Sequence, residues 1–243
     1  MTITAIVCAF NEATYLPACL YSLRAQTRPP DEIIVIDNAS TDQTGSVAAE
    51  VPGVRVIREP RKGLVIARET ARRAARGDVL AFVDADCRAP LSWLERVERR
   101  LQTSSAVALT GPYRFYDWDR TGRALIRMYD LVVAPPTHVV VHDLLKLGAI
   151  FYGGNFAVRA AALQRIGGFD DRIEFHGEDT NVGRRLTAVG PVELCADCWV
   201  WTSARRYRAM GKRRVFGLYV RNFWSEILRH RPADHDHVDV RTE

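Results

Sequence analysis

The sequence predicts a single-domain α/β protein built on a mostly parallel, Rossmann-like sheet flanked by helices. In the first half of the 243 residues, apolar runs rich in β-branched residues alternate with stretches whose apolar residues recur at helical spacing. Three of these runs end on polar residues: Phe10-Asn11-Glu12, Asp37-Asn38 and Asp84-Ala85-Asp86. Because ligands of such sheets bind beyond the carboxyl ends of the strands, we expect one site at this edge.

The elements of the first half follow in regular order. Runs typical of strands buried on both faces occupy 3–10, 32–36, 54–58 and 79–83. Helical patterns follow them at 14–26, 40–50, 64–76 and 91–101. Ser40 supplies a cap signal for the second of these helices, and Gly77 and Pro90 mark the end of the third and the start of the fourth.

The second half is less regular. Strands are expected at 107–111, 151–159 and 192–201, and helices at 121–133, 160–166, 178–189 and 212–231. Pro135-Pro136 is expected to stop the helix that begins at 121. No run approaches 18 apolar residues, so no membrane-spanning helix is expected.

Composition is ordinary for a soluble protein, with 47% hydrophobic and 26% charged residues. The first residues carry no basic stretch, which makes a signal peptide unexpected and a cytoplasmic location the simple interpretation. Between Arg205 and Arg231 nine Lys and Arg face one Glu, a local balance of +8 that leaves −3 for the rest, since the total is +5. This distribution excludes a generally basic nucleic-acid binder and sets 205–243 apart from 1–204 as a basic C-terminal extension.

The predicted helix 212–231 is amphipathic and basic. Its apolar stripe consists of Phe216, Tyr219, Val220, Phe223, Trp224 and Ile227. Basic and aromatic residues together suit peripheral docking on an anionic membrane or on a lipid-linked acceptor. The alternative, which we favour slightly, is an ordinary helix that packs this stripe on the core.

Cys195 and Cys198 have the Cys-x-x-Cys spacing of redox motifs and half zinc sites. A zinc site needs two further ligands at matching spacing, and none stands out. We therefore interpret the pair as two cysteines in or beside a buried strand.

Asp84 and Asp86 form one of three Asp-x-Asp pairs, the others being Asp117-Asp119 and Asp234-Asp236. Only the first pair closes a strand candidate, so its position distinguishes it. Two carboxylates there can hold a hard divalent cation, and that cation can hold a diphosphate.

From about residue 3 to residue 207 the chain resembles the family 2 glycosyltransferases of the GT-A fold, which use nucleotide-diphospho-sugars. The ordered set of motifs carries the resemblance: Val7 to Glu12, Ile34 to Asp42, Gly63 to Gly77, Val83 to Asp86, Gly153 to Phe156, Gly167 to Asp170 and Gly177 to Asp179. It implies a GT-A domain over 1–204 and a role in building cell-envelope polysaccharide.

The resemblance implies roles at the donor site. Asp37 would read the nucleotide base, usually uracil, although with Ser40 it could instead cap the next helix. The remaining nucleotide-binding candidates are Ala9, Phe10, Glu12, Lys62, Gly63, Arg68 and Asp84. Phe10 offers either a stacking face or core packing, and Lys62-Gly63 with Arg68 suits phosphate oxygens.

The resemblance also implies roles at the reacting centre. Asp86, with Asp84, would bind Mg2+ or Mn2+. Asp179 would take the proton from the acceptor hydroxyl, with Glu178 as orienting partner or second choice, while His176 is a base by chemistry alone. Gly153, Gly154 and the amide of Asn155 would approach the sugar.

A histidine that often completes the metal shell in the family is absent from 199–206. This leaves the third metal ligand open and makes Arg205 or Arg206 a candidate for the diphosphate.

The predicted function is inverting transfer of a sugar, from a UDP-sugar by the usual pattern of the family, to a hydroxyl of a glycan or lipid-linked acceptor. Two alternatives remain. A sugar nucleotidyltransferase would need a basic, glycine-rich loop after the first strand, where this chain has Ala9-Phe10-Asn11-Glu12. A non-catalytic nucleotide-sugar binding module would keep the Asp-x-Asp pair and lack a base such as Asp179.

Overall fold

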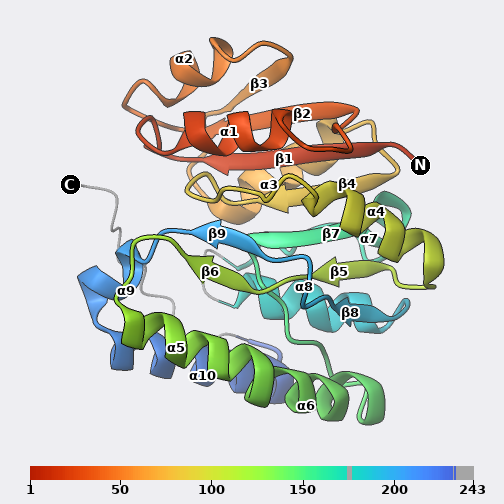
Figure 1. Cartoon of the computed structure of the whole chain (residues 1–243). Coiled ribbons are helices and arrows are strands. Elements are labelled where there is room, and N and C mark those ends of the chain that lie inside the picture. The colour runs from red at the N-terminus through yellow and green to blue at the C-terminus, as the bar shows by residue number, and fades with distance from the viewer. Residues whose placement is uncertain (174–176, 232, 234–243) are drawn as a thin grey trace.

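In the computed structural model, which describes residues 1–173, 177–231 and 233, a central sheet is covered by helices on both faces (Figure 1). Its seven strands lie in the order β3-β2-β1-β4-β7-β5-β8. The alternation predicted for the first half is confirmed by β1 (Ile3–Ala9), β2 (Glu32–Asn38), β3 (Val54–Glu59) and β4 (Val79–Val83). These four strands pair in parallel, so their carboxyl ends share one edge.

The far half of the sheet is mixed. Strand β7 (Asn155–Arg159) runs antiparallel between β4 and β5 (Ala108–Thr110), and β8 (Val192–Leu194) closes the edge in parallel with β5. The predicted strand 192–201 is divided, because its second part, β9 (Val200–Thr202), pairs with β6 (Tyr113–Phe115) in a separate two-stranded sheet. Reversing β7 brings its first residue, Asn155, beside the last residue of β4.

Helices α1 (Leu16–Arg24) and α4 (Trp93–Thr103) pack on one face of the sheet. Helices α3 (Leu64–Ala74), α7 (Ala160–Arg165) and α8 (Glu178–Thr187) pack on the other, and α2 (Thr44–Ala49) lies near β3. Buried side chains of β1 alternate between the two cores, as a strand covered on both faces requires.

A long helical rod replaces the short helix predicted at 121–133. It consists of α5 (Arg120–Met128), the π-helical turn η1 (Tyr129–Val133), α6 (Ala134–His138) and a second π-helical turn, η2 (Val139–Leu144). The predicted stop at Pro135-Pro136 is wrong. The prolines occupy the first turn of α6, where a missing N–H breaks no helical bond, and the wider turn before them takes up the change of register.

The rod also overturns the expectation that no segment is long and apolar enough to span a membrane. Over its 25 residues, Arg120–Leu144 meets that test by length and composition, with 17% of the tested window buried. Counting uninterrupted apolar residues misses it, because two prolines, a threonine and a histidine interrupt the run.

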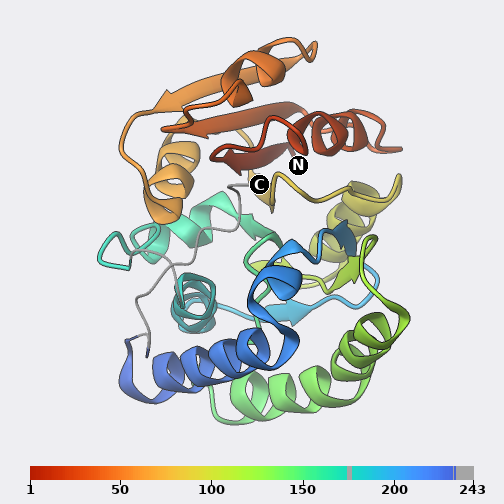
Figure 2. The ribbon, with the colours of Figure 1, turned by 90° about the vertical axis from the view of Figure 1, so that its left-hand side faces the viewer.

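The chain continues into α9 (Arg205–Met210) and α10 (Lys212–Arg229), which lies beside the rod at one end of the molecule (Figures 1 and 2). The buried face of α10 is Val215, Asn222, Ser225, Glu226 and Ile227. Of the predicted apolar stripe, only Ile227 is buried, and Phe216, Tyr219, Val220 and Trp224 are exposed. The favoured interpretation of α10 as a helix with its stripe on the core is therefore wrong, because polar contacts to α8 hold the opposite side.

Candidate active site

Polar side chains gather at the carboxyl edge of the parallel strands, as predicted. Asp84 and Asp86 follow β4, and Asp37 is the last residue but one of β2. The second Asp-x-Asp pair has other partners: Asp117 binds Ser203 and Arg208, and Asp119 caps α5. Asp234, Asp236 and the candidate base His176 lie outside the described residues.

Arg205 joins two acidic residues of this edge. Its Nε atom lies 3.0 Å from Oδ2 of Asp86, and its Nη1 donates to Oε2 of Glu12 at 2.9 Å. The Glu12 side chain is 3% exposed and that of Asp86 11%. Burial alone would lower the pKa of Arg205, but the hydrogen bonds to Glu12 and the charge of Asp86 raise it. The first residue of α9 is therefore a permanent cation held between two carboxylates.

Arg206 faces the same acidic centre. Burial lowers its pKa, whereas the hydrogen bond to Tyr219 and the charges of Asp84 and Glu178 raise it, with a net increase. The first two residues of α9 therefore both direct a guanidinium group toward the carboxylates. Guanidinium groups suit phosphate oxygens, and the phosphate role of the arginine pair stays a prediction.

Gly153 and Gly154 let the backbone pass between two acidic groups. A Cβ on Gly154 would lie 2.0 Å from Oδ2 of Asp84, and one on Gly153 would lie 3.1 Å from Oε1 of Glu178 and 3.0 Å from Cβ of Asp179. The N–H of Gly154 donates to the hydroxyl of Tyr113 at 2.6 Å. A side chain at Gly154 would displace the Asp84 carboxylate, and one at Gly153 would crowd the Glu178-Asp179 pair, so the two glycines let these acidic groups lie close together.

Asp179 is the base candidate at the start of α8. Burial raises its pKa to about 7, and the negative charge of Glu178 adds to the increase. Its Oδ1 accepts from the N–H of Thr180 at 2.7 Å, while Oε2 of Glu178 accepts from the N–H of Asp179 at 2.8 Å. A carboxylate with a pKa near neutrality, beside a second carboxylate, is chemically suited to take up a proton.

Arg68 contacts protein groups in this structure, and its predicted contact with phosphate stays a prediction. Its Nη1 donates to Oε1 of Glu178 at 2.7 Å and its Nη2 to the carbonyl oxygen of Gly153 at 2.6 Å. The residue is buried. Because these contacts fix both terminal nitrogens, Arg68 positions Glu178 and the glycine pair in this structure.

Asn155 also contacts protein groups. It is 1% exposed, its Oδ1 accepts from Nε1 of Trp93 at 3.1 Å, and its Nδ2 donates to the carbonyl oxygens of Gly111 and Cys198 at 2.9 and 2.8 Å. An amide with these partners holds loops together, so the expected contact with sugar hydroxyls is not supported.

The nucleotide candidates line the other end of the edge. Oδ1 of Asp37 accepts from the N–H of Ser40 at 3.3 Å, and a Cβ on Gly45 would lie 2.7 Å from its Oδ2. The N-cap of α2 is Gln43, so the alternative in which Asp37 caps that helix is wrong. Ala9 is buried, and Phe10 is half-buried with Nζ of Lys62 4.0 Å above its ring.

Three residues that shape the site are not predicted as site residues from the sequence. Asn38 donates to the carbonyl oxygen of Arg61 at 2.6 Å and accepts from the N–H of Gly63 at 2.8 Å, which fixes the loop after β3. Tyr113 reaches Gly154 from β6, and Tyr219 reaches Arg206 from α10. Only Asn38 had a signal, since it follows Asp37 at a strand end.

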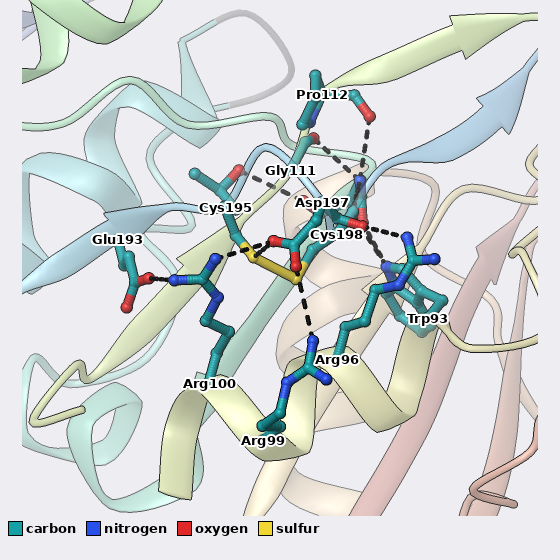
Figure 3. Close-up of a disulfide and its surroundings, with 12 residues drawn as sticks. Trp93, Arg96, Arg99, Arg100, Gly111, Pro112, Glu193, Cys195, Asp197 and Cys198 are labelled. Carbon is teal, nitrogen blue, oxygen red and sulfur yellow. Dashed lines mark hydrogen bonds and ion pairs between the residues drawn. A yellow bond between two sulfur atoms is a disulfide. The ribbon is translucent and has the colours of Figure 1, made fainter. Parts of the chain in front are cut away.

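Cys195 and Cys198 form a disulfide in the loop between β8 and β9 (Figure 3). Asp197 lies within this loop and pairs with Arg100 at 3.3 Å, and the carbonyl oxygen of Cys198 accepts from Nε1 of Trp93 at 3.2 Å. In the described ranges, Cys195, Asp197 and Cys198 are the single cluster of three or more potential ligands. Because a disulfide offers no thiolate, the zinc alternative is not supported.

The Asp84 and Asp86 pair fits a divalent cation. Carboxylate oxygens are hard ligands of the kind that Mg2+ and Mn2+ prefer. The guanidinium group of Arg205 already lies against Asp86, which shows that this position favours a positive charge. Across the described residues no third ligand side chain joins them, so a cation would complete its shell with diphosphate oxygens and water.

The fold and this site define a GT-A type protein. The chain belongs to glycosyl transferase family 2, whose model matches residues 4–167. It is 27% identical over 195 residues to "Glycosyltransferase AglE" of Haloferax volcanii, which covers 77% of this chain and 62% of that protein. The chain therefore spans less than two thirds of this relative.

Solved structures show the same fold. The mannosyltransferase PcManGT from Pyrobaculum calidifontis, in complex with GDP-Man and Mn2+, superposes with a TM-score of 0.68 at 22% identity, over 93% of this chain and 64% of that one. Glucosyl-3-phosphoglycerate synthase from Mycobacterium tuberculosis, in complex with Mn2+, UDP and glucosyl-3-phosphoglycerate, gives 0.66 at 20% identity, over 95% and 80%. The predicted fold and family are confirmed.

Proposed function

We propose that this chain transfers a sugar from a nucleotide-diphospho-sugar, a UDP-sugar by preference, to an acceptor hydroxyl with inversion at the anomeric carbon. The observation that carries the proposal is Asp179, a half-buried carboxyl with a pKa of about 7, across the glycine pair from Asp84. Family membership and the complexes of the two similar structures with nucleotide and Mn2+ support it.

In the proposed single displacement, the acceptor oxygen forms a bond to the anomeric carbon while the bond to the diphosphate oxygen breaks. The acceptor proton goes to Asp179, which Glu178 and Arg68 hold in place. The nucleoside diphosphate departs with the bonding electron pair. Arg205 and Arg206 lie at the carboxylate edge and would offset the charge of the departing diphosphate.

A divalent cation, Mg2+ or Mn2+, would be held by Asp86 and Asp84, and when bound it supplies Lewis-acid stabilisation of the leaving diphosphate. Asp37 would read the base, with Ala9 and Phe10 beside it and Lys62-Gly63 near the phosphates. Glu12 would act by holding Arg205. We further propose that the enzyme works at the cytoplasmic face of the membrane, in building cell-envelope polysaccharide on a glycan or lipid-linked acceptor.

The test is nucleoside diphosphate release from a panel of UDP- and GDP-sugars, with Mn2+ or Mg2+ present. We expect Asp179→Asn and Asp86→Asn each to lower turnover by about 100-fold or more. The matched control is Asp119→Asn, because Asp119 belongs to another Asp-x-Asp pair, caps α5 and pairs with Lys212.

Each alternative gives a different result. Donor binding without turnover in any acceptor mixture would indicate a binding module. Pyrophosphate formation from a sugar phosphate and a nucleoside triphosphate would indicate a nucleotidyltransferase. Full transfer activity of Asp179→Asn would refute the base assignment, and undiminished turnover in excess EDTA would refute the metal.

A further inference from the structure

The rod and the three residues that follow it, 120–147, expose an apolar face along their whole length. Val132 is 63% exposed and Leu144 70%, although both are aliphatic. The other exposed apolar residues of this face are Leu125, Met128, Leu131, Val133, Val139, Val140, Leu145 and Leu147. Soluble monomers rarely leave so many large apolar side chains together in water, so this face indicates an interaction surface.

The opposite face of the rod is fastened to the domain. Gly122 lies against the ring of Trp118, and Ala134 and Val141 are buried. Nε2 of His138 lies 2.9 Å from the carbonyl oxygen of Val192, and Nε2 of His142 accepts from the N–H of Val192 at 3.0 Å. With contacts at both ends, the rod lies along the domain, so it can rest on a membrane surface but cannot cross it while the domain stays folded.

Helix α10 adds a second exposed apolar face at the same end of the molecule. Phe216, Val220, Trp224 and Leu228 follow at intervals of four residues, which places them on one side of the helix. The ring centroids of Phe216 and Tyr129 lie 6.1 Å apart, and Ile227 packs against Gly148. These contacts hold α10 beside the rod (Figures 1 and 2), and we name the exposed faces of the two together the basal surface.

Cations surround the basal surface. Its two segments, 120–147 and 212–231, carry ten Lys and Arg against three Asp and Glu, a net charge of +7. The exposed cations are Arg120, Arg123, Arg127, Lys146, Arg213, Arg214, Arg221, Arg229 and Arg231. Of the three acids, Glu226 is buried against Arg184 and Asp130 binds the hydroxyl of Tyr152. An apolar face with a basic border complements an anionic bilayer.

We propose that the basal surface lies flat on an anionic lipid bilayer. Helix α10 packs on α8, which begins at the Glu178-Asp179 pair, so docking would bring the base near the lipid. Tyr129 of the rod and Tyr219 of α10 also lie near the charge of Asp179. An acceptor carried by a lipid head group would then reach the base from the membrane. This consequence rests on the proposed function, whereas the docking itself does not.

The test is co-sedimentation of the full chain with vesicles of phosphatidylcholine, alone or with one third phosphatidylglycerol. We expect binding to the anionic vesicles only, and a loss of at least tenfold between about 0.05 M and 0.5 M NaCl. Leu144→Ser/Leu228→Ser should weaken it about tenfold or more, and so should Arg213→Glu/Arg214→Glu. All four side chains are exposed, and circular dichroism checks that the variants remain folded.

The matched controls are Tyr21→Ser/Leu91→Ser and Arg24→Glu, which change exposed residues of α1 and of the segment before α4. They should bind vesicles as the wild type does. Quenching of tryptophan fluorescence by brominated lipid should fall in Trp224→Phe, which changes the basal surface, and persist in Trp199→Phe. The difference reports which side of the protein faces the lipid.

Two results would overturn the proposal. One is equal or absent binding to both vesicle types at low salt. The other is a stable dimer in light scattering that Leu144→Ser/Leu228→Ser dissociates, because a second copy would then cover the surface. Neither result depends on glycosyl transfer, so failure of docking and failure of the proposed function are distinguishable.

Discussion

The Nε atom of Arg205 lies 3.0 Å from Oδ2 of Asp86, so a permanent cation rests on the carboxylate that we propose as metal ligand. The same guanidinium binds Glu12, which holds it at the edge of the sheet. A metal ion at Asp86 must share this carboxylate with Arg205 or displace it. Metal binding and the position of α9 are therefore coupled in our proposal.

The first prediction concerns that competition. Removing the charge in Arg205→Gln should tighten binding of Mn2+ to the donor-free protein by about tenfold, since a charge-assisted hydrogen bond contributes about 1.5 kcal/mol or more. At the same time the KM for the donor should rise, because a phosphate-facing cation is lost. Electron paramagnetic resonance of free Mn2+ measures the first effect and steady-state kinetics the second.

Arg208→Gln is the control for Arg205. It lies on the same helix but pairs with Asp117. Its affinity for Mn2+ should match that of the wild type. If Arg205→Gln leaves the affinity unchanged while Asp86→Asn abolishes it, the two cations do not compete.

The second prediction concerns pH. With a pKa of about 7, Asp179 is mostly protonated below neutrality and cannot accept a proton, so kcat should rise with pH and level off above about 8. Glu178→Gln removes a neighbouring negative charge and frees Arg68 to act on Asp179. We expect the acid limb of the profile to move down by about one unit. If the acid limb of the kcat–pH profile is the same in Glu178→Gln as in the wild type, the titrating group is not Asp179.

The third prediction concerns the glycine pair. Because a Cβ on Gly154 would lie 2.0 Å from Oδ2 of Asp84, Gly154→Ala should displace that carboxylate and lower kcat/KM by about 100-fold. Gly217→Ala is the control, since a Cβ there has no neighbour within 4 Å and the residue is in the exposed part of α10. If Gly154→Ala and Gly217→Ala are equally active in the release assay, a side chain at Gly154 does not disturb Asp84.

Much of this arrangement is predictable from the sequence, and the exceptions have physical causes. Asp37 and Asp84 lie where expected, because strand length and parallel order determine where buried strands end. Arg68 and Asn155 differ, since their partners, Glu178 and Cys198, lie 110 and 43 residues away. Local sequence does not reveal which of several polar groups a long side chain will reach.

The rod and α10 illustrate a second limit. Periodicity correctly finds an apolar stripe on α10, but it does not tell which face of a helix packs on the domain. There the polar residues Glu226 and Asn181 form the contact, with 3.0 Å between Oε1 and Nδ2. Four of the six stripe residues are left exposed, which is the reverse of the usual pattern.

The last prediction concerns stability. Folding raises the pKa of Asp179 from an ordinary value of 3.8 to about 7, so the folded protein binds this proton more tightly than the unfolded chain. That contribution is fully present below about pH 4 and is lost as the pH rises through 7. Asp179→Asn removes the buried charge, so it should raise Tm by about 3 °C or more at pH 8 and much less at pH 5. Thermal unfolding followed by circular dichroism at both pH values measures the difference. An equal effect at both pH values would mean that the charge of Asp179 is not what destabilises the site.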